Sequence, residues 1–129
     1  MAPVPADASD ERRAQRRLGQ ELLDEVAADL AALPGSSRRR MFGCEGLFTA
    51  GRVVAFVDGD GALVVKLPPD RASDLVAEGT ATRVRMGRSP AREWVAVPRA
   101  GAADELRPLW AELVRASYDH VSSGAPRPS

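Results

Sequence analysis

Cysteine and histidine are nearly absent from this sequence of 129 residues, which contains one of each, Cys44 and His120. A single thiol cannot form an internal disulfide, and a single imidazole cannot anchor a histidine-based metal cluster. The two residues belong to different predicted elements, a glycine-flanked turn and the end of the last helix. The sequence therefore gives no reason to expect a Cys–His catalytic pair, and we expect no enzyme activity, no metal and no cofactor.

Long apolar runs are also missing. No segment approaches the ~18 consecutive apolar residues of a membrane span. The N-terminus has no basic region followed by an apolar stretch, which a secretory signal requires. We therefore expect a cytoplasmic protein without a membrane partner.

An excess of charge of either sign is absent too, because 18 basic residues balance 18 acidic ones. This balance argues against a nucleic-acid-binding protein held by bulk charge. Between residues 38 and 92, however, there are ten basic and six acidic residues. The arginines of this region form a candidate surface for nucleic acid or a protein partner: Arg38, Arg39, Arg40, Arg52 and Arg88.

The remaining composition is that of an ordinary folded domain, with 44% apolar and 28% charged residues. A chain of this length forms one hydrophobic core. We expect a single domain over residues 10–121, with flexible tails at residues 1–9 and 122–129.

Two long amphipathic helices are predicted, one at each end of the domain. The first spans residues 10–33, where an apolar stripe with steps of three and four residues begins at Leu18. The last spans residues 104–121 and has the same period, so Pro108 is expected near its first turn. Prolines open a shorter helix over residues 68–79.

Six short strands are predicted between these helices, at residues 40–42, 47–49, 52–57, 62–67, 82–86 and 93–97. Residues 58–61, Asp-Gly-Asp-Gly, are typical of a hairpin turn; a calcium loop is excluded because its twelfth position is Pro69. Connections this short make neighbouring strands antiparallel. The order α-β-β-β-β-α-β-β-α therefore predicts an α+β fold with helices on one face of an antiparallel sheet.

The run Met-Phe-Gly-x-x-Gly-Leu-Phe-x-x-Gly-x-Val-x-Ala, which begins at Met41, resembles the opening of the TfoX N-terminal domain family (TfoX/Sxy family). The similarity continues through residues 63–68, the Gly87-Arg88 loop and residues 93–98. The candidate motif residues, expected to be structural, are Met41, Phe42, Gly43, Gly46, Lys66, Pro68 and Trp94.

The resemblance implies a small α+β domain with the layout predicted above. Some members of the family regulate competence for DNA uptake and carry a second, helical C-terminal domain; this chain resembles the stand-alone members. The resemblance supplies no catalytic residue. We therefore expect a non-catalytic binding or regulatory domain that contacts an unknown protein partner or a second copy of itself.

Residues 113–121 also resemble the MmcQ/YjbR family, which has a similar element order and a suggested DNA-binding role. The alternative function is therefore a nucleic-acid-binding module that uses an arginine-rich sheet surface.

Overall fold

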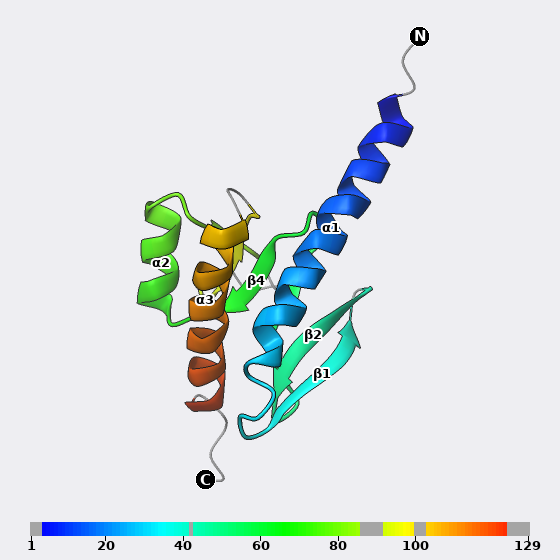
Figure 1. Cartoon of the computed structure of the whole chain (residues 1–129). Helices are drawn as coiled ribbons and strands as arrows, with labels where there is room; N and C mark the ends of the chain where they lie inside the picture. Colours follow the sequence, from blue (N-terminus) through cyan, green and yellow to red (C-terminus); the bar gives the residue numbers. More distant parts are fainter. Residues whose placement is uncertain (1–3, 42, 86–91, 100–102, 124–129) are drawn as a thin grey trace.

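The computed structural model describes residues 4–41, 43–85, 92–99 and 103–123, and it confirms the predicted order of helices and strands (Figure 1). In chain order the elements are α1 (Val4–Ala28), β1 (Ser36–Met41), β2 (Cys44–Thr49), β3 (Arg52–Val57), β4 (Leu63–Lys66), α2 (Pro69–Ala77), β5 (Thr82–Arg83), β6 (Trp94–Val97) and α3 (Ala103–Ser123).

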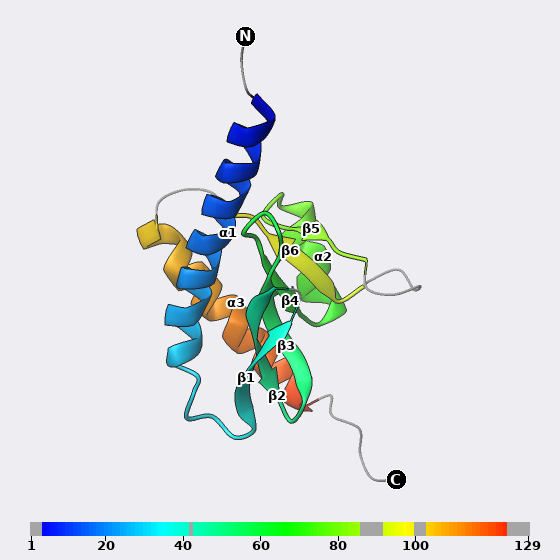
Figure 2. The same cartoon turned by 90° about the vertical axis from the view of Figure 1, so that its right-hand side faces the viewer.

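The strands form one six-stranded sheet in the order β1-β2-β3-β4-β6-β5, and every neighbouring pair is antiparallel. Helices α1 and α3 lie side by side on one face of this sheet, with α2 next to α3 (Figures 1 and 2). The predicted α+β class, with helices on one face of an antiparallel sheet, is confirmed.

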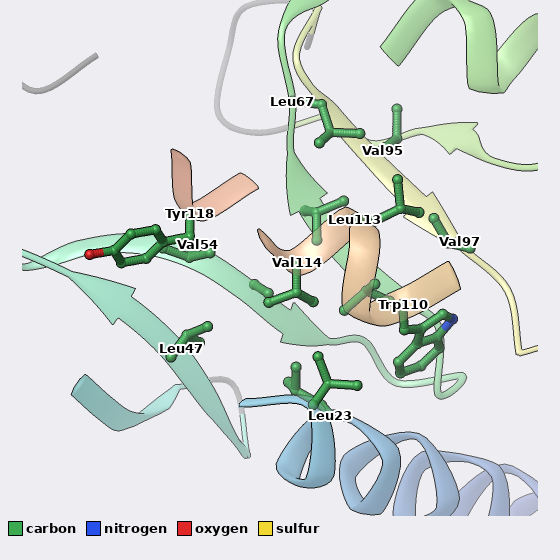
Figure 3. Packing of buried hydrophobic residues seen from close by; sticks show 14 of the residues in the cluster. Leu23, Leu47, Val54, Leu67, Val95, Val97, Trp110, Leu113, Val114 and Tyr118 are labelled. Carbon is green, nitrogen blue, oxygen red and sulfur yellow. The ribbon is translucent and has the colours of Figure 1, made fainter. Parts of the chain in front are cut away.

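The main hydrophobic core lies between the helices and the sheet (Figure 3). Its fully buried side chains come from α1, α3, the strands and the residue after β4, and they include Leu23, Leu47, Val54, Leu63, Leu67, Val95, Trp110, Leu113 and Val114. Burial of each such side chain stabilises the fold by roughly 1.5–3 kcal/mol. This layer fixes α1 and α3 against the sheet.

A second, smaller apolar cluster lies on the opposite face of the sheet. Its buried members are Cys44, Phe56, Val64 and Ala96, with Met41, Val53, Ala62, Val84 and Trp94 packed against them. The rings of Phe56 and Trp94 contact each other at 6.4 Å between centroids. In the part of the chain that the structure describes, no helix contributes to this cluster.

A β-bulge interrupts the pairing of β2 with β3. Leu47 pairs with Ala55 but the next residue, Phe48, pairs with Val53, so Val54 is an extra residue. As a result Val54 and Ala55 both face the helices. The buried hydroxyl of Ser117 on α3 donates to the Val54 carbonyl at 2.8 Å.

Two glycines bring α1 into contact with the turn between β3 and β4. A Cβ atom on Gly19 would collide with the Gly61 carbonyl, and one on Gly61 would collide with the Gln15 carbonyl. Gly61 also has φ +86°, a conformation that side chains disfavour. Asp58 closes the turn, because its carboxylate accepts from the N–H groups of the two residues at positions 60 and 62. The predicted hairpin is confirmed.

The first helix differs from its prediction at both ends. It begins at Val4 rather than at residue 10, and it ends at Ala28, after which turns with i to i+3 hydrogen bonds continue to Leu33. Leu18, expected in the buried stripe, is 43% exposed. The fully buried face of α1 starts at Gly19; before it, Gln15 contacts Gly61 of the β3–β4 turn but is only partly buried.

Other boundaries also move. Strand β1 begins at Ser36 because all six of its residues pair with β2, and this pairing outweighs the poor alternation of its arginines. Strand β2 begins at Cys44, within the segment that the sequence assigned to a turn. Pro108 lies in the second turn of α3 and is exposed. Because proline has no N–H, the carbonyl four residues earlier lacks its helical partner, and solvent can bond that carbonyl instead.

Candidate functional site

The connection between β1 and β2 contains the start of the motif. Met41 pairs with Cys44 across it, and Gly43 has φ +79°. A Cβ atom on Gly46 would lie 2.7 Å from the Met41 sulfur. Met41 is half-buried against the second apolar cluster, and not in the main core. Phe42 lies outside the described residues.

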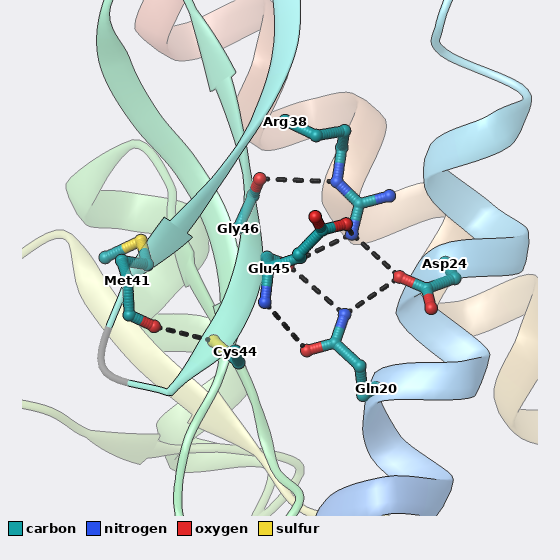
Figure 4. A network of polar contacts seen from close by, with 7 residues as sticks. All are labelled: Gln20, Asp24, Arg38, Met41, Cys44, Glu45 and Gly46. Carbon is teal, nitrogen blue, oxygen red and sulfur yellow. Dashed lines mark hydrogen bonds and ion pairs between the residues drawn. The ribbon is translucent and has the colours of Figure 1, made fainter.

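A polar network joins α1 to the beginning of β2 (Figure 4). The carboxamide of Gln20 accepts from the Glu45 N–H at 3.1 Å and donates to the Glu45 carbonyl at 3.2 Å. The guanidinium of Arg38 donates to Asp24 at 2.7 Å and to the Gly46 carbonyl at 3.3 Å. These contacts hold the β1–β2 turn beside α1.

A groove of about 490 Å³ lies between α1 and this turn. We call it the arginine groove; it is lined by Arg13, Arg16, Arg17, Gln20, Glu21, Gly43 and Cys44. The lining contains three arginines and one glutamate, all on α1, so it is basic on balance, although Arg13 is also paired with Asp10. Glycine is favoured at position 43 by its φ of +79°, whereas a Cβ atom there would meet the end of the flexible Arg16 side chain.

This groove was not among the sites expected from the sequence. Arg13, Arg16, Arg17 and Gln20 follow helical steps of three and four, which place them on one face of α1. That periodicity was available in the sequence. The sequence did not show that the β1–β2 turn lies opposite this face of the helix.

The arginines chosen from sequence do not form one continuous surface. In β1, Arg38 and Arg40 are oriented toward the helix-bearing face, whereas Arg39 lies over the Phe48 ring, at 5.1 Å from its centroid. Arg52 lies at the far end of the sheet, where it pairs with Thr49. Arg88 lies outside the described residues.

The remaining motif residues lie away from the arginine groove. Lys66 ends β4 and pairs with Trp94 at the start of β6. Pro68 precedes α2, and its carbonyl accepts from the N–H of Ala72 at 2.9 Å. The structure therefore places these three residues around the β4–α2 connection, where they organise the sheet and the short helix.

Cys44 and His120 have separate partners. The Cys44 thiol is buried and contacts the Met41 carbonyl at 3.2 Å. The His120 Nε2 atom lies 2.6 Å from the Glu93 carboxylate, at the other end of the sheet. The thiol and the imidazole therefore contact different groups.

The described ranges contain no group of three or more histidine, cysteine, aspartate or glutamate residues placed to hold a metal ion. None of their helices combines the length and the apolar character needed to cross a membrane.

Comparison with known proteins assigns the chain to a family. No curated protein and no solved structure matches the chain. The family model described as TfoX N-terminal domain matches residues 28–121. This range contains β1, the β1–β2 turn and all the motif residues on which the resemblance was based. The chain therefore belongs to the TfoX N-terminal domain family.

Proposed function

We propose that this domain is a non-catalytic binding module that recognises an acidic segment of a protein partner in the arginine groove. The single observation that carries this proposal is the lining of the groove, in which three arginines of α1 face a glycine-containing turn. Carboxylates of a partner would pair with these arginines while its main chain approaches the bare backbone of Gly43.

The surroundings of the groove favour a short acidic segment over a long polyanion. Asp10 is bonded to Arg13 at 3.2 Å, and Asp60 is bonded to Arg12 at 3.0 Å. A nucleic-acid backbone extending along α1 would meet these carboxylates, which repel phosphate. The arginines of β1 alternate between faces and so offer no continuous track for phosphates.

A binding role also agrees with the surroundings of the thiol. Cys44 lines the groove, but its sulfur is buried and is in contact with a backbone carbonyl. The imidazole lies elsewhere, against Glu93, and the described residues contain no group of three or more potential metal ligands. The groove supplies charge and shape for recognition, and we assign it no chemical step.

The test is fluorescence anisotropy with a labelled glutamate-rich peptide, a glutamine-rich peptide of equal length, and a labelled DNA duplex. The groove variant is Arg13→Gln with Arg17→Gln. The matched control is Arg71→Gln with Arg115→Gln, which removes the same charge from arginines paired elsewhere, with Glu112 and Asp119.

Each exposed charge pair contributes up to about 1 kcal/mol, so the groove variant should bind the glutamate peptide about tenfold more weakly. The control should change affinity less than about twofold. An equal loss in both variants would contradict the proposal. Tighter binding of the duplex, with the same dependence on Arg13 and Arg17, would favour the nucleic-acid alternative.

A further inference from the structure

Strand β1 is an edge strand with one free side. All six residues from Ser36 to Met41 pair with β2, and no strand of the described chain pairs with the other side of β1. Figure 1 shows this edge at the border of the sheet, away from α3. The backbone N–H and C=O groups on such a side can bond a further strand.

We infer, on the basis of the proposed function, that the acidic segment binds as an additional strand along β1. Main-chain hydrogen bonds to β1 supply the alignment, and the arginines select the charge. This deepens the proposal by naming the backbone conformation that the partner adopts.

The side chains of β1 fit an acidic neighbour on both faces. Arg39 and Arg40 are exposed and point to opposite faces of the sheet. The Phe48 ring beneath Arg39 keeps that guanidinium close to the sheet. Directly opposite residues of paired strands share a face, so a carboxylate opposite each arginine lies within reach. Consecutive acidic residues in the added strand satisfy both arginines.

The remaining arginine of β1, Arg38, already has an acidic partner within the domain. Arg38 is bonded to Asp24 and to the carbonyls of Glu45 and Gly46. It therefore anchors β1 to the domain and leaves the attraction of a partner to Arg39 and Arg40.

A second copy of the chain is a poor occupant of this edge. Antiparallel pairing of two β1 strands would place arginines of one copy opposite or diagonal to arginines of the other. Like charges at these positions destabilise a strand pair. The same arginines that disfavour pairing with a second β1 strand attract an acidic strand.

The free edge leads into the arginine groove. Strand β1 ends at Met41, and the two residues Gly43 and Cys44 that follow at the turn line the groove. A strand that continues past Met41 would run toward the turn that forms one wall of the groove. One extended segment makes both sets of contacts.

The experiment measures amide hydrogen exchange by NMR in the intact protein, with and without a short glutamate-rich peptide that contains consecutive glutamates. Strand addition predicts that exchange slows at alternate β1 amides, those pointing to the free edge, by about tenfold or more at saturation. The same peptide methylated on every second backbone nitrogen is the second probe, prepared in both frames. One frame should bind about tenfold more weakly than the other, because only one set of N–H groups faces β1.

The outcomes separate the two proposals. If the peptide binds in the Arg13- and Arg17-dependent manner but β1 amides keep their exchange rates, strand addition is overturned and the proposed function stands. If the unmodified peptide fails to bind at low salt, the proposed function fails. A third outcome concerns samples without peptide. If exchange of the free-edge β1 amides slows as the protein concentration rises, a second copy of the chain is the occupant and the inference is overturned.

Discussion

The side-chain carboxamide of Gln20 on α1 forms hydrogen bonds with both backbone polar groups of Glu45 on β2, at 3.1 and 3.2 Å. The pairing of β2 with β3 starts only at Leu47, so the preceding part of β2 has no strand on that side. The carboxamide takes the place of the missing strand neighbour. It thereby fixes the distance between α1 and the β1–β2 turn, on which the arginine groove depends.

Gln20→Leu should speed hydrogen exchange of the Glu45 amide by about tenfold, because the acceptor for its N–H is lost. NMR exchange rates measure this directly. Gln15→Leu is the matched control on the same helix, since Gln15 accepts a bond from Arg99 and not from β2. Unchanged exchange at Glu45 in the Gln20 variant would show that water, not the carboxamide, satisfies this amide.

Ser117→Ala should lower the free energy of unfolding by about 2–3 kcal/mol. The hydroxyl is fully buried, donates to the Val54 carbonyl and accepts from the Lys66 N–H at 3.1 Å. Both backbone groups lose this partner in the variant. Urea denaturation measures the change, with Ser123→Ala at the exposed end of α3 as control. Equal stability of the two variants would contradict this role for Ser117.

Gly61→Ala should cost more than Gly79→Ala, although both glycines have similar positive φ values, +86° and +81°. No atom lies within 4 Å of a Cβ placed on Gly79, so that variant measures backbone strain alone, about 1–2 kcal/mol. On Gly61 the Cβ also collides with the backbone of α1. We expect an additional loss of about 2 kcal/mol in thermal or chemical unfolding. Equal losses would mean that α1 does not press on this hairpin.

Gly46→Ala should be tolerated better when Met41 is shortened. The new Cβ would lie 2.7 Å from the Met41 sulfur and 3.2 Å from the Ala55 carbonyl. Removing the sulfur by Met41→Ala relieves the shorter contact. A double-mutant cycle of unfolding free energies should therefore show a coupling of about 1 kcal/mol. Additive losses would indicate that the Ala55 carbonyl, and not Met41, requires glycine at this position.

Local chemistry made much of the fold predictable. The Asp58 turn carries its own signal, because a carboxylate and glycines close a hairpin without help from distant residues. The same holds for Pro69 at the start of α2 and Gly79 after its end. These short connections then required antiparallel strands, and the apolar periods of α1 and α3 placed both helices on the sheet.

The arginine groove was not predictable in this way. Its walls meet because α1 contacts Gly61 through Gly19, a contact between residues far apart in the chain. The bulge at Val54 was equally hidden, since an all-apolar run gives no alternation to show which residues share a face. The arginine run of β1 was visible, but its division between two faces depends on strand register with β2.

The extra residue in β3 bears on which changes in length this strand tolerates. Val53 and Phe56 lie on the second cluster, whereas the two residues between them both face the helices. Deleting one of those two leaves every other side chain on its present face and restores simple alternation. Deleting a residue elsewhere in β3 reverses the orientation of its neighbours and exposes part of the core. Homologous domains one residue shorter here would thus keep the same fold, with only the acceptor for Ser117 rearranged.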